Sequence, residues 1–145
     1  MNDEGDCLRA ALLLMAMSAR TAPKGKGQDS IVTRIVLKED LPALAAAMKA
    51  FGEKHDLRFF IRDAGNVAAS AACLIIGVKG QETLGINCQG CGYSSCAAMS
   101  EACGEMEESV SPFLGPNCIM KVADLGIAVG SAVKRGTKNI SGSKP

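Results

Sequence analysis

Residues 73–96 read CLIIGVKGQETLGINCQGCGYSSC and contain the two features that decide the expected fold. The apolar run at residues 73–78 stops before Gly80, which predicts a short strand buried on both faces. The glycine-rich loop that follows contains Cys88, Cys91 and Cys96. We therefore expect a sheet strand that leads directly into a metal-binding or redox segment.

The regions on either side of this stretch alternate between helical and strand patterns. Apolar residues recur at helical spacing in some segments, whereas other segments are short and rich in Val and Ile. Such alternation predicts an α/β (α+β) domain of layered sheet and helices. The expected helices cover residues 7–20, 41–54, 63–72, 94–108 and 120–134, with Asp40 and Asp63 as N-caps, and the expected strands cover residues 31–37, 57–61 and 73–78.

The expected organisation is a single domain over residues 1–134. Within it, residues 80–118 form the metal-binding segment, since five of the seven cysteines lie between residues 88 and 118. Residues 135–145 are polar and lack apolar periodicity, so we expect a disordered end. The last helix is rich in small residues, which permit the close approach of a backbone, a cofactor or a partner subunit, or dense packing on the sheet: Gly126, Ala128, Gly130 and Ala132.

Composition and charge limit the class of partner. The formal net charge is +1, and the chain has no Trp, one Tyr and four Phe, so neither a basic nor a base-stacking surface for nucleic acid is expected. The apolar run at residues 10–17 follows acidic residues and is too short for a membrane span, which argues against a signal peptide or a membrane protein. We expect a cytoplasmic protein with reduced thiols, because a secreted disulfide scaffold needs an export signal.

The cysteine spacing favours an iron–sulfur cluster. Cys88, Cys91 and Cys96 lie within nine residues, and Cys118 follows after a gap in GPNC. Three nearby thiolates can hold one side of a compact cluster while a distant fourth completes the ligand set. Glycines at positions 90 and 92 let the backbone turn tightly and direct N–H groups at the sulfur atoms.

Two other chemistries remain open for these cysteines. A four-cysteine zinc site usually pairs two CxxC knuckles, and this sequence has only one, Cys88–Cys91. That same pair could act as a redox dithiol, which would leave Cys96 and Cys118 without a role. Cys103 is an alternative fourth ligand or a small buried hydrophobe.

The remaining reactive side chains have simpler explanations. Cys73 lies in an apolar strand and is expected in the core, while Cys7, at a helix start, has no evident partner. The single histidine, His55, lies near a helix end, where it complements the helix dipole. No hydrolase, Walker or dinucleotide motif is found in the sequence.

The segment LGINCQGCGYSSCAAMSEA, together with GPNC, resembles the [4Fe–4S] module of electron-transport and corrinoid iron–sulfur proteins. By position, this resemblance implies Cys88, Cys91, Cys96 and Cys118 as the cluster ligands. Gln89 replaces a glycine of that module, and Ile119 replaces a proline that often follows the last cysteine.

Over nearly its whole length the sequence is similar to the uncharacterised ferredoxin-domain-containing family. The similarity rests on SARTAPKGKGQDSI, FFIRDAGNVAAS, LIIGVKG, NCQGCGYSSC and DLGIAVGSAV. That family itself resembles flavin-dependent nitroreductases, which implies a nitroreductase-like layered fold, FMN as a second cofactor and a homodimer formed through the DLGIAVGSAV helix. Arg20, Lys24 and Lys26 would then contact the flavin phosphate, or they are solvated loop cations.

Two functions follow as expectations. In the first, the protein is an iron–sulfur redox protein that passes electrons between an unidentified redox partner and, through the nitroreductase resemblance, a flavin. In the second, it is a binding or sensor module whose four-cysteine site, loaded with iron–sulfur or zinc, is mainly structural.

Overall fold

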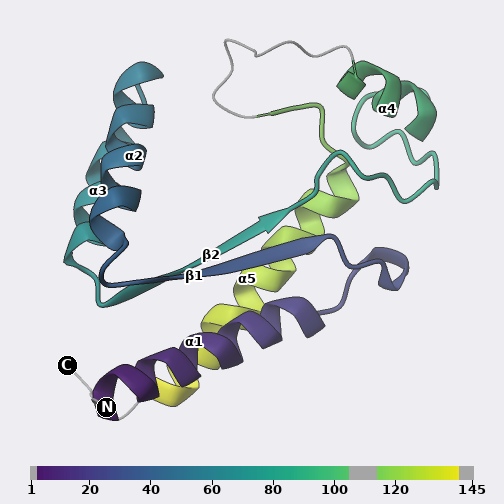
Figure 1. The fold of residues 1–145 in the computed structure, drawn as a ribbon. Helices are drawn as coiled ribbons and strands as arrows, with labels where there is room; N and C mark the ends of the chain where they lie inside the picture. The colour runs from purple at the N-terminus through teal and green to yellow at the C-terminus, as the bar shows by residue number, and fades with distance from the viewer. Residues whose placement is uncertain (1–2, 105–113, 141–145) are drawn as a thin grey trace. The chain divides into compact units, whose positions relative to one another are not determined.

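The computed structural model describes residues 3–104 and 114–140, which form a mixed α+β structure. The described chain divides into two compact units, one of residues 3–33, 76–104 and 114–140 and the other of residues 34–75. The elements in chain order are α1 (Asp3–Thr21), the 3₁₀ helix η1 (Gly25–Gly27), β1 (Ile31–Leu37), α2 (Leu41–Lys54), α3 (Arg58–Ala69), β2 (Ala72–Val78), α4 (Cys96–Gly104) and α5 (Ile119–Ile140) (Figure 1).

β1 and β2 pair as a two-stranded sheet. The Lys79 amide donates to the Ser30 carbonyl at 2.9 Å, and Gly77 lies opposite Val32. Residue numbers therefore rise along one strand as they fall along the other, so the pairing is antiparallel. Both strands were predicted, and β1 has the predicted bounds.

β2 is less buried than its apolar sequence predicts. Its residues are half-buried, except Ile75, which is 39% exposed, and Cys73 is half-buried rather than in the core. The prediction of a strand buried on both faces is therefore wrong for the described residues. A two-stranded sheet supplies only one strand neighbour, whereas the sequence predicted a larger sheet.

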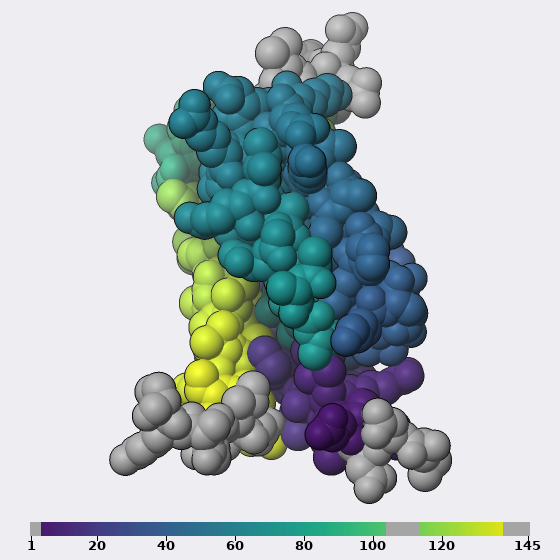
Figure 2. Space-filling view, turned by 90° about the vertical axis from the view of Figure 1, so that its left-hand side faces the viewer, coloured from purple at the N-terminus to yellow at the C-terminus, as the bar shows by residue number. Residues whose placement is uncertain are grey.

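α1 and α5 pack side by side in the first unit (Figures 1 and 2). The contact is close because small residues line it: Ala19 and Ala128 have no exposed surface, and Ala132 has 1%. A Cβ added to Gly136 would lie 2.9 Å from the Met15 sulfur. α1 is therefore the neighbour that Ala128 and Ala132 admit, and the helix pair is the core of this unit. Gly126 and Gly130, the other two small residues singled out in the sequence, are exposed, and a Cβ added to either would meet nothing within 4 Å.

α5 extends further than predicted. It continues to Ile140, six residues beyond the expected end at residue 134. The packing of Gly136 on α1 gives this polar segment a reason to stay helical, which the composition alone did not show. Residues 141–145 lie outside the described residues, as do residues 105–108 of the expected fourth helix.

The second unit contains α2 and α3, which pack as a helical pair. α2 has the predicted bounds, and Asp40 occupies its N-cap position, although its side chain makes no capping hydrogen bond. His55 is the C-cap residue, and its ring lies 4.6 Å from the ring of Phe51. The predicted position of the histidine at a helix end is confirmed.

The strand expected at residues 57–61 is wrong, because this segment begins α3. Its aromatic residues favour a strand locally, but Phe60, Ile61 and Ala64 recur at helical spacing and face α2. Tertiary packing therefore decides the local structure. Asp63 is not an N-cap but lies inside α3, where it pairs with Arg62 at 2.8 Å.

The tightest point of this helical pair is Gly52. A Cβ at this position would lie 2.9 Å from the Phe60 Cβ and 3.0 Å from the Leu57 carbonyl oxygen, neither of which can move without shifting α3. We expect Gly52→Ala to lower the free energy of unfolding by about 1–3 kcal/mol. Urea denaturation followed by circular dichroism measures this loss.

Gly65 is the matched control in the same unit. It lies in α3, and a Cβ there would meet nothing within 4 Å. Gly65→Ala should therefore raise stability by up to about 1 kcal/mol through helix propensity alone. Equal changes in the free energy of unfolding for the two substitutions would show that α3 does not restrict the space at Gly52.

Candidate metal centre

The CxxC loop is built on unusual backbone conformations. Asn87 and Gln89 have positive φ angles of 47° and 60°, and Gly92 has 87°. The Gly92 amide donates to the Gln89 carbonyl at 2.9 Å, which closes a tight turn over residues 89–92 that contains Cys91. Gln89, which replaces a glycine of the resembled module, therefore occupies a conformation that glycine favours.

Cys96 lies at the first position of α4. Its amide donates to Asn87 Oδ1 at 2.9 Å, and Ser95 Oγ accepts from the Ala98 amide at 3.1 Å. Both contacts satisfy amides that the start of a helix leaves free. The loop that carries Cys88 and Cys91 is thereby fixed to the helix that carries Cys96.

Hydrogen bonds also favour the thiolate form of Cys96. The backbone of Asn87 makes the largest contribution to lowering the pKa of this thiol, and the backbone of Gly85 and Ile86 and the Thr83 side chain add to it, against the opposing effect of desolvation. A thiolate is the form that binds metals and reacts as a nucleophile. The loop is therefore suited to hold a sulfur ligand in its charged state.

We predict that Cys96 of the metal-free protein reacts with iodoacetamide at unusually low pH. Because its pKa is lowered from the ordinary value of 9.0, the thiolate should form at lower pH than in a model thiol. Mass spectrometry of alkylation against pH measures the midpoint. Thr83→Val should move it upward, and a midpoint at or above 9.0 in the unaltered protein would contradict the hydrogen-bonding pattern.

Cys118 lies just before α5 and is buried. Its amide donates to the Gly80 carbonyl at 2.7 Å, which joins it to the segment after β2. A Cβ added to Gly90 would lie 2.7 Å from Ile119 Cγ2 and 3.6 Å from Cys88 Sγ. The CxxC loop therefore lies against the residue next to Cys118.

All seven cysteines are free thiols, but the described residues contain no group of three or more His, Cys, Asp or Glu side chains arranged to hold a metal ion. The structure brings together the segments that carry the four predicted ligands without assembling a preformed ion site. The donor set itself fits a cluster, since thiolates are the ligands of iron–sulfur centres. Their assignment as ligands remains a prediction.

The other cysteines have separate positions. The Cys103 thiol lies 3.5 Å from the Pro116 carbonyl oxygen, so it bonds to the loop that leads to Cys118. Cys7 is exposed on α1, and Cys73 lies in β2. Cys103 is therefore the one alternative ligand that lies close to the candidate site.

The three loop cations predicted at a flavin phosphate all have protein partners. Arg20 pairs with Asp29 at 2.8 Å, and the Lys26 Nζ donates to the Leu84 carbonyl at 3.1 Å. Lys24, whose side chain is 4% exposed, donates to three carbonyls at the end of α1: Ala19, Arg20 and Ala22. These contacts hold the loop of residues 21–30 in place.

Two buried charged residues of α5 support the same loop. Lys121 is 1% exposed and donates to the Gln28 carbonyl at 3.2 Å, while Asp124 is 4% exposed and accepts from the Gly25 amide at 3.0 Å. The other Asp124 oxygen, Oδ2, is buried without a hydrogen-bond partner among the described residues. The available sequence signal was the pair of charges, Lys121 and Asp124, within the apolar first half of this helix.

Comparison with known proteins finds a family similarity at the C-terminal part of the chain. Residues 114–140, which contain Cys118 and α5, match the family described as "Uncharacterized protein containing a ferredoxin domain (DUF2148)". The similarity to this ferredoxin-domain family therefore covers the last described segment of the chain. An uncharacterized protein of Archaeoglobus fulgidus is 48% identical over 127 residues, which cover 88% of this chain and 66% of the archaeal protein.

The chain thus spans 66% of the length of this archaeal relative. No solved structure matches it significantly. In the part of the chain that the structure describes, no helix has an apolar stretch of the length and hydropathy that a bilayer span requires.

Proposed function

We propose that the protein is an iron–sulfur electron carrier in which Cys88, Cys91, Cys96 and Cys118 hold a [4Fe–4S] cluster. The observation that supports this most directly is the contact of the CxxC loop with the start of α5, where Gly90 lies against Ile119. This contact brings the separated fourth cysteine to the same region as the other three. The ferredoxin domain in the name of the matched family supports iron–sulfur binding.

The protein's own residues would set the properties of the bound group. A [4Fe–4S] cluster supplies one-electron redox chemistry when bound. Backbone amides of residues 85–87 favour the thiolate of Cys96, and the burial of Cys118 limits the access of water to its sulfur. Both effects act on charge and dielectric around the sulfur ligands, which are the means by which a protein tunes such a centre.

Reversible reduction tests the electron-carrier function. Anaerobic protein treated with dithionite should lose most of its visible absorption near the cluster band and regain it on oxidation by an added acceptor. Iron content should be the same before and after the cycle. Irreversible bleaching with loss of iron would contradict a role as an electron carrier.

A structural or sensor role is the second candidate. Residues 79–95 form no helix or strand between β2 and α4, and such a long irregular loop gains order from a bound metal. Zinc would give a colourless protein that does not cycle with dithionite. The reduction experiment therefore separates the two functions.

Flavin coupling on a nitroreductase-like fold is a separate part of the proposal. It is supported by the sequence resemblance at residues 18–31 and 124–133. A flavin phosphate at the 21–30 loop would have to compete with the contacts of Arg20, Lys24 and Lys26. Flavin absorption of the purified protein tests this part independently of iron.

We also propose a homodimer formed through α5. Figure 2 shows part of α5 as an exposed yellow-green strip. Val122, Ile127, Val129 and Val133 are each at least 40% exposed in the described chain. An exposed apolar face of this kind is typical of an interaction surface. A molar mass measured by light scattering at twice the chain mass of 15.0 kDa would support self-association.

A further inference from the structure

A hollow of about 310 Å³ lies between the end of α1 and the second half of α5. Two of its lining residues, Ala22 and Pro23, are apolar. The other lining residues carry hydroxyl or cationic side chains: Ser18, Thr21, Ser131, Lys134 and Arg135. No carboxylate lines the hollow among the described residues, so its polar groups suit an anion.

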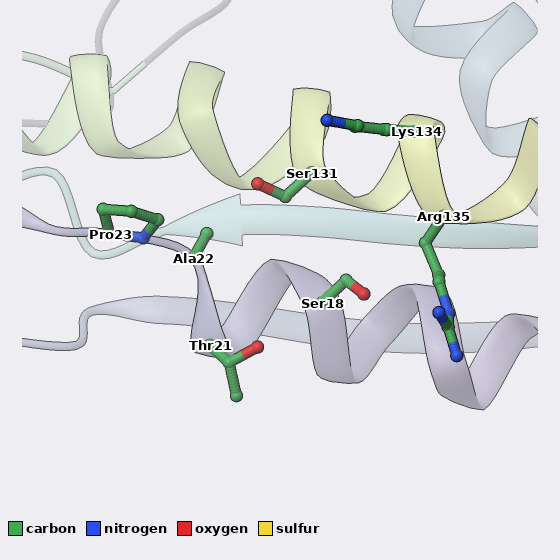
Figure 3. A pocket seen from close by; sticks show the side chains of 7 residues that line it. All are labelled: Ser18, Thr21, Ala22, Pro23, Ser131, Lys134 and Arg135. Carbon is green, nitrogen blue, oxygen red and sulfur yellow. The ribbon is translucent and has the colours of Figure 1, made fainter.

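Side chains from both helices lie around the hollow (Figure 3). Ser18 projects from α1 toward α5, Ser131 projects from α5 toward α1, and Arg135 reaches across from α5 toward α1. Thr21 donates its hydroxyl proton to the Met17 carbonyl at 2.9 Å, so it does not serve as a donor. The two serines and Arg135 are the donors that lie toward the space between the helices, whereas the Lys134 side chain runs along α5 on the side away from α1 (Figure 3).

The end of a helix usually disfavours an anion, because its free carbonyls carry partial negative charge. Here the Lys24 ammonium binds the Ala19 and Arg20 carbonyls in the last turn of α1, and the Ala22 carbonyl just after the helix at 2.9 Å. The nearby carboxylate of Asp29 is paired with Arg20 at 2.8 Å. The local negative charges are therefore neutralised by groups outside the hollow.

We propose that this hollow binds a phosphate group, either free phosphate or the monoester of a small molecule. The planar guanidinium of Arg135 can bind two phosphate oxygens at once, the serine hydroxyls supply further donors, and Lys134 adds a positive charge at the edge of the hollow. The volume lies at the lower end of the range for small-ligand sites, which is about 300–1,000 Å³. Two cations are too few for the extended phosphate contacts of a nucleic acid.

Titration with inorganic phosphate, followed by NMR of the backbone amides at constant ionic strength, tests the site. Residues 18–22 and 131–135 should shift and saturate. The double variant Lys134→Ala/Arg135→Ala should bind at least about ten-fold more weakly, since it loses the charge-assisted hydrogen bonds. The control Arg9→Ala/Lys38→Ala removes the same charge elsewhere and should bind as the unaltered protein does.

Shifts that do not saturate, or equal binding by both double variants, would overturn the proposal. Iron content is measured on every variant, so a failure of phosphate binding is distinguished from a failure of the cluster. A parallel titration with glycerol phosphate distinguishes a site for free phosphate from a site for a phosphate monoester. If glycerol phosphate binds more tightly than inorganic phosphate, the ligand is a monoester whose organic part contacts Ala22 and Pro23. If the two bind equally, the ligand is the free phosphate ion.

Discussion

Replacement of Cys118 by serine is expected to remove the cluster. Iron should fall from about four atoms per chain, the content of a [4Fe–4S] centre, to less than about one. Cys118 is buried at the start of α5, and a serine hydroxyl is a poor ligand where a soft thiolate is needed. Iron analysis and visible absorption of anaerobically purified variants measure the loss, and Cys91→Ser should behave in the same way.

Cys103 and Cys73 provide matched controls. Cys103 bonds to the Pro116 carbonyl in the loop before Cys118, and Cys73 lies in β2, so Cys103→Ser and Cys73→Ser should both keep full iron content. If Cys103→Ser lost the iron while Cys118→Ser retained it, Cys103 would be the fourth ligand. Full iron content in the Cys91→Ser variant would refute the assignment as a whole.

Loss of Asp124 is expected to have the largest effect on stability outside the cysteines. Asp124→Ala leaves the half-buried Gly25 amide without its acceptor and removes a negative charge from the helix face that carries buried Lys121. An unsatisfied buried group costs about 1–3 kcal/mol, and an uncompensated buried charge adds to this. Urea denaturation of the metal-free protein should show the loss.

Asp124→Asn is the matched variant. Its Oδ1 can still accept from Gly25, so it should lose less stability than Asp124→Ala. Its amide also places a donor at the position where Oδ2 has no partner among the described residues. Equal losses in the two variants would show that charge, rather than the hydrogen bond to Gly25, is what matters, and no loss in either would contradict the supporting role of α5.

Most helices and strands could be predicted from the local sequence, because the local helix or strand preference of these segments agrees with their packing in the fold. The Val- and Ile-rich run gave β1, and a helix with Pro42 in its first turn gave α2, both with the observed bounds. The strand predicted at residues 57–61 was wrong, since aromatic residues have strand propensity but pack here on α2. The predicted end of α5 at residue 134 was wrong for a similar reason, because the contact of Gly136 with Met15 of α1 forms only in the folded unit.

The candidate site was partly predictable. Cysteine spacing predicted the candidate metal-binding segment, since cysteine is a rare residue and its thiol indicates metal or redox chemistry without knowledge of the fold. The roles of Lys24, Lys121 and Asp124 could not be predicted, because they depend on which loop lies against which helix. Lys134 and Arg135 were also missed, since they fall at the boundary of a segment expected to be disordered and gain a role only beside α1.

The measurement that tests the central claim most directly is iron, sulfide and zinc analysis of protein purified without oxygen, with its visible spectrum. We predict about four iron and four sulfide per chain and a broad absorption typical of a cysteine-ligated cluster. About one zinc per chain and no colour would contradict the cluster and leave a structural four-cysteine site.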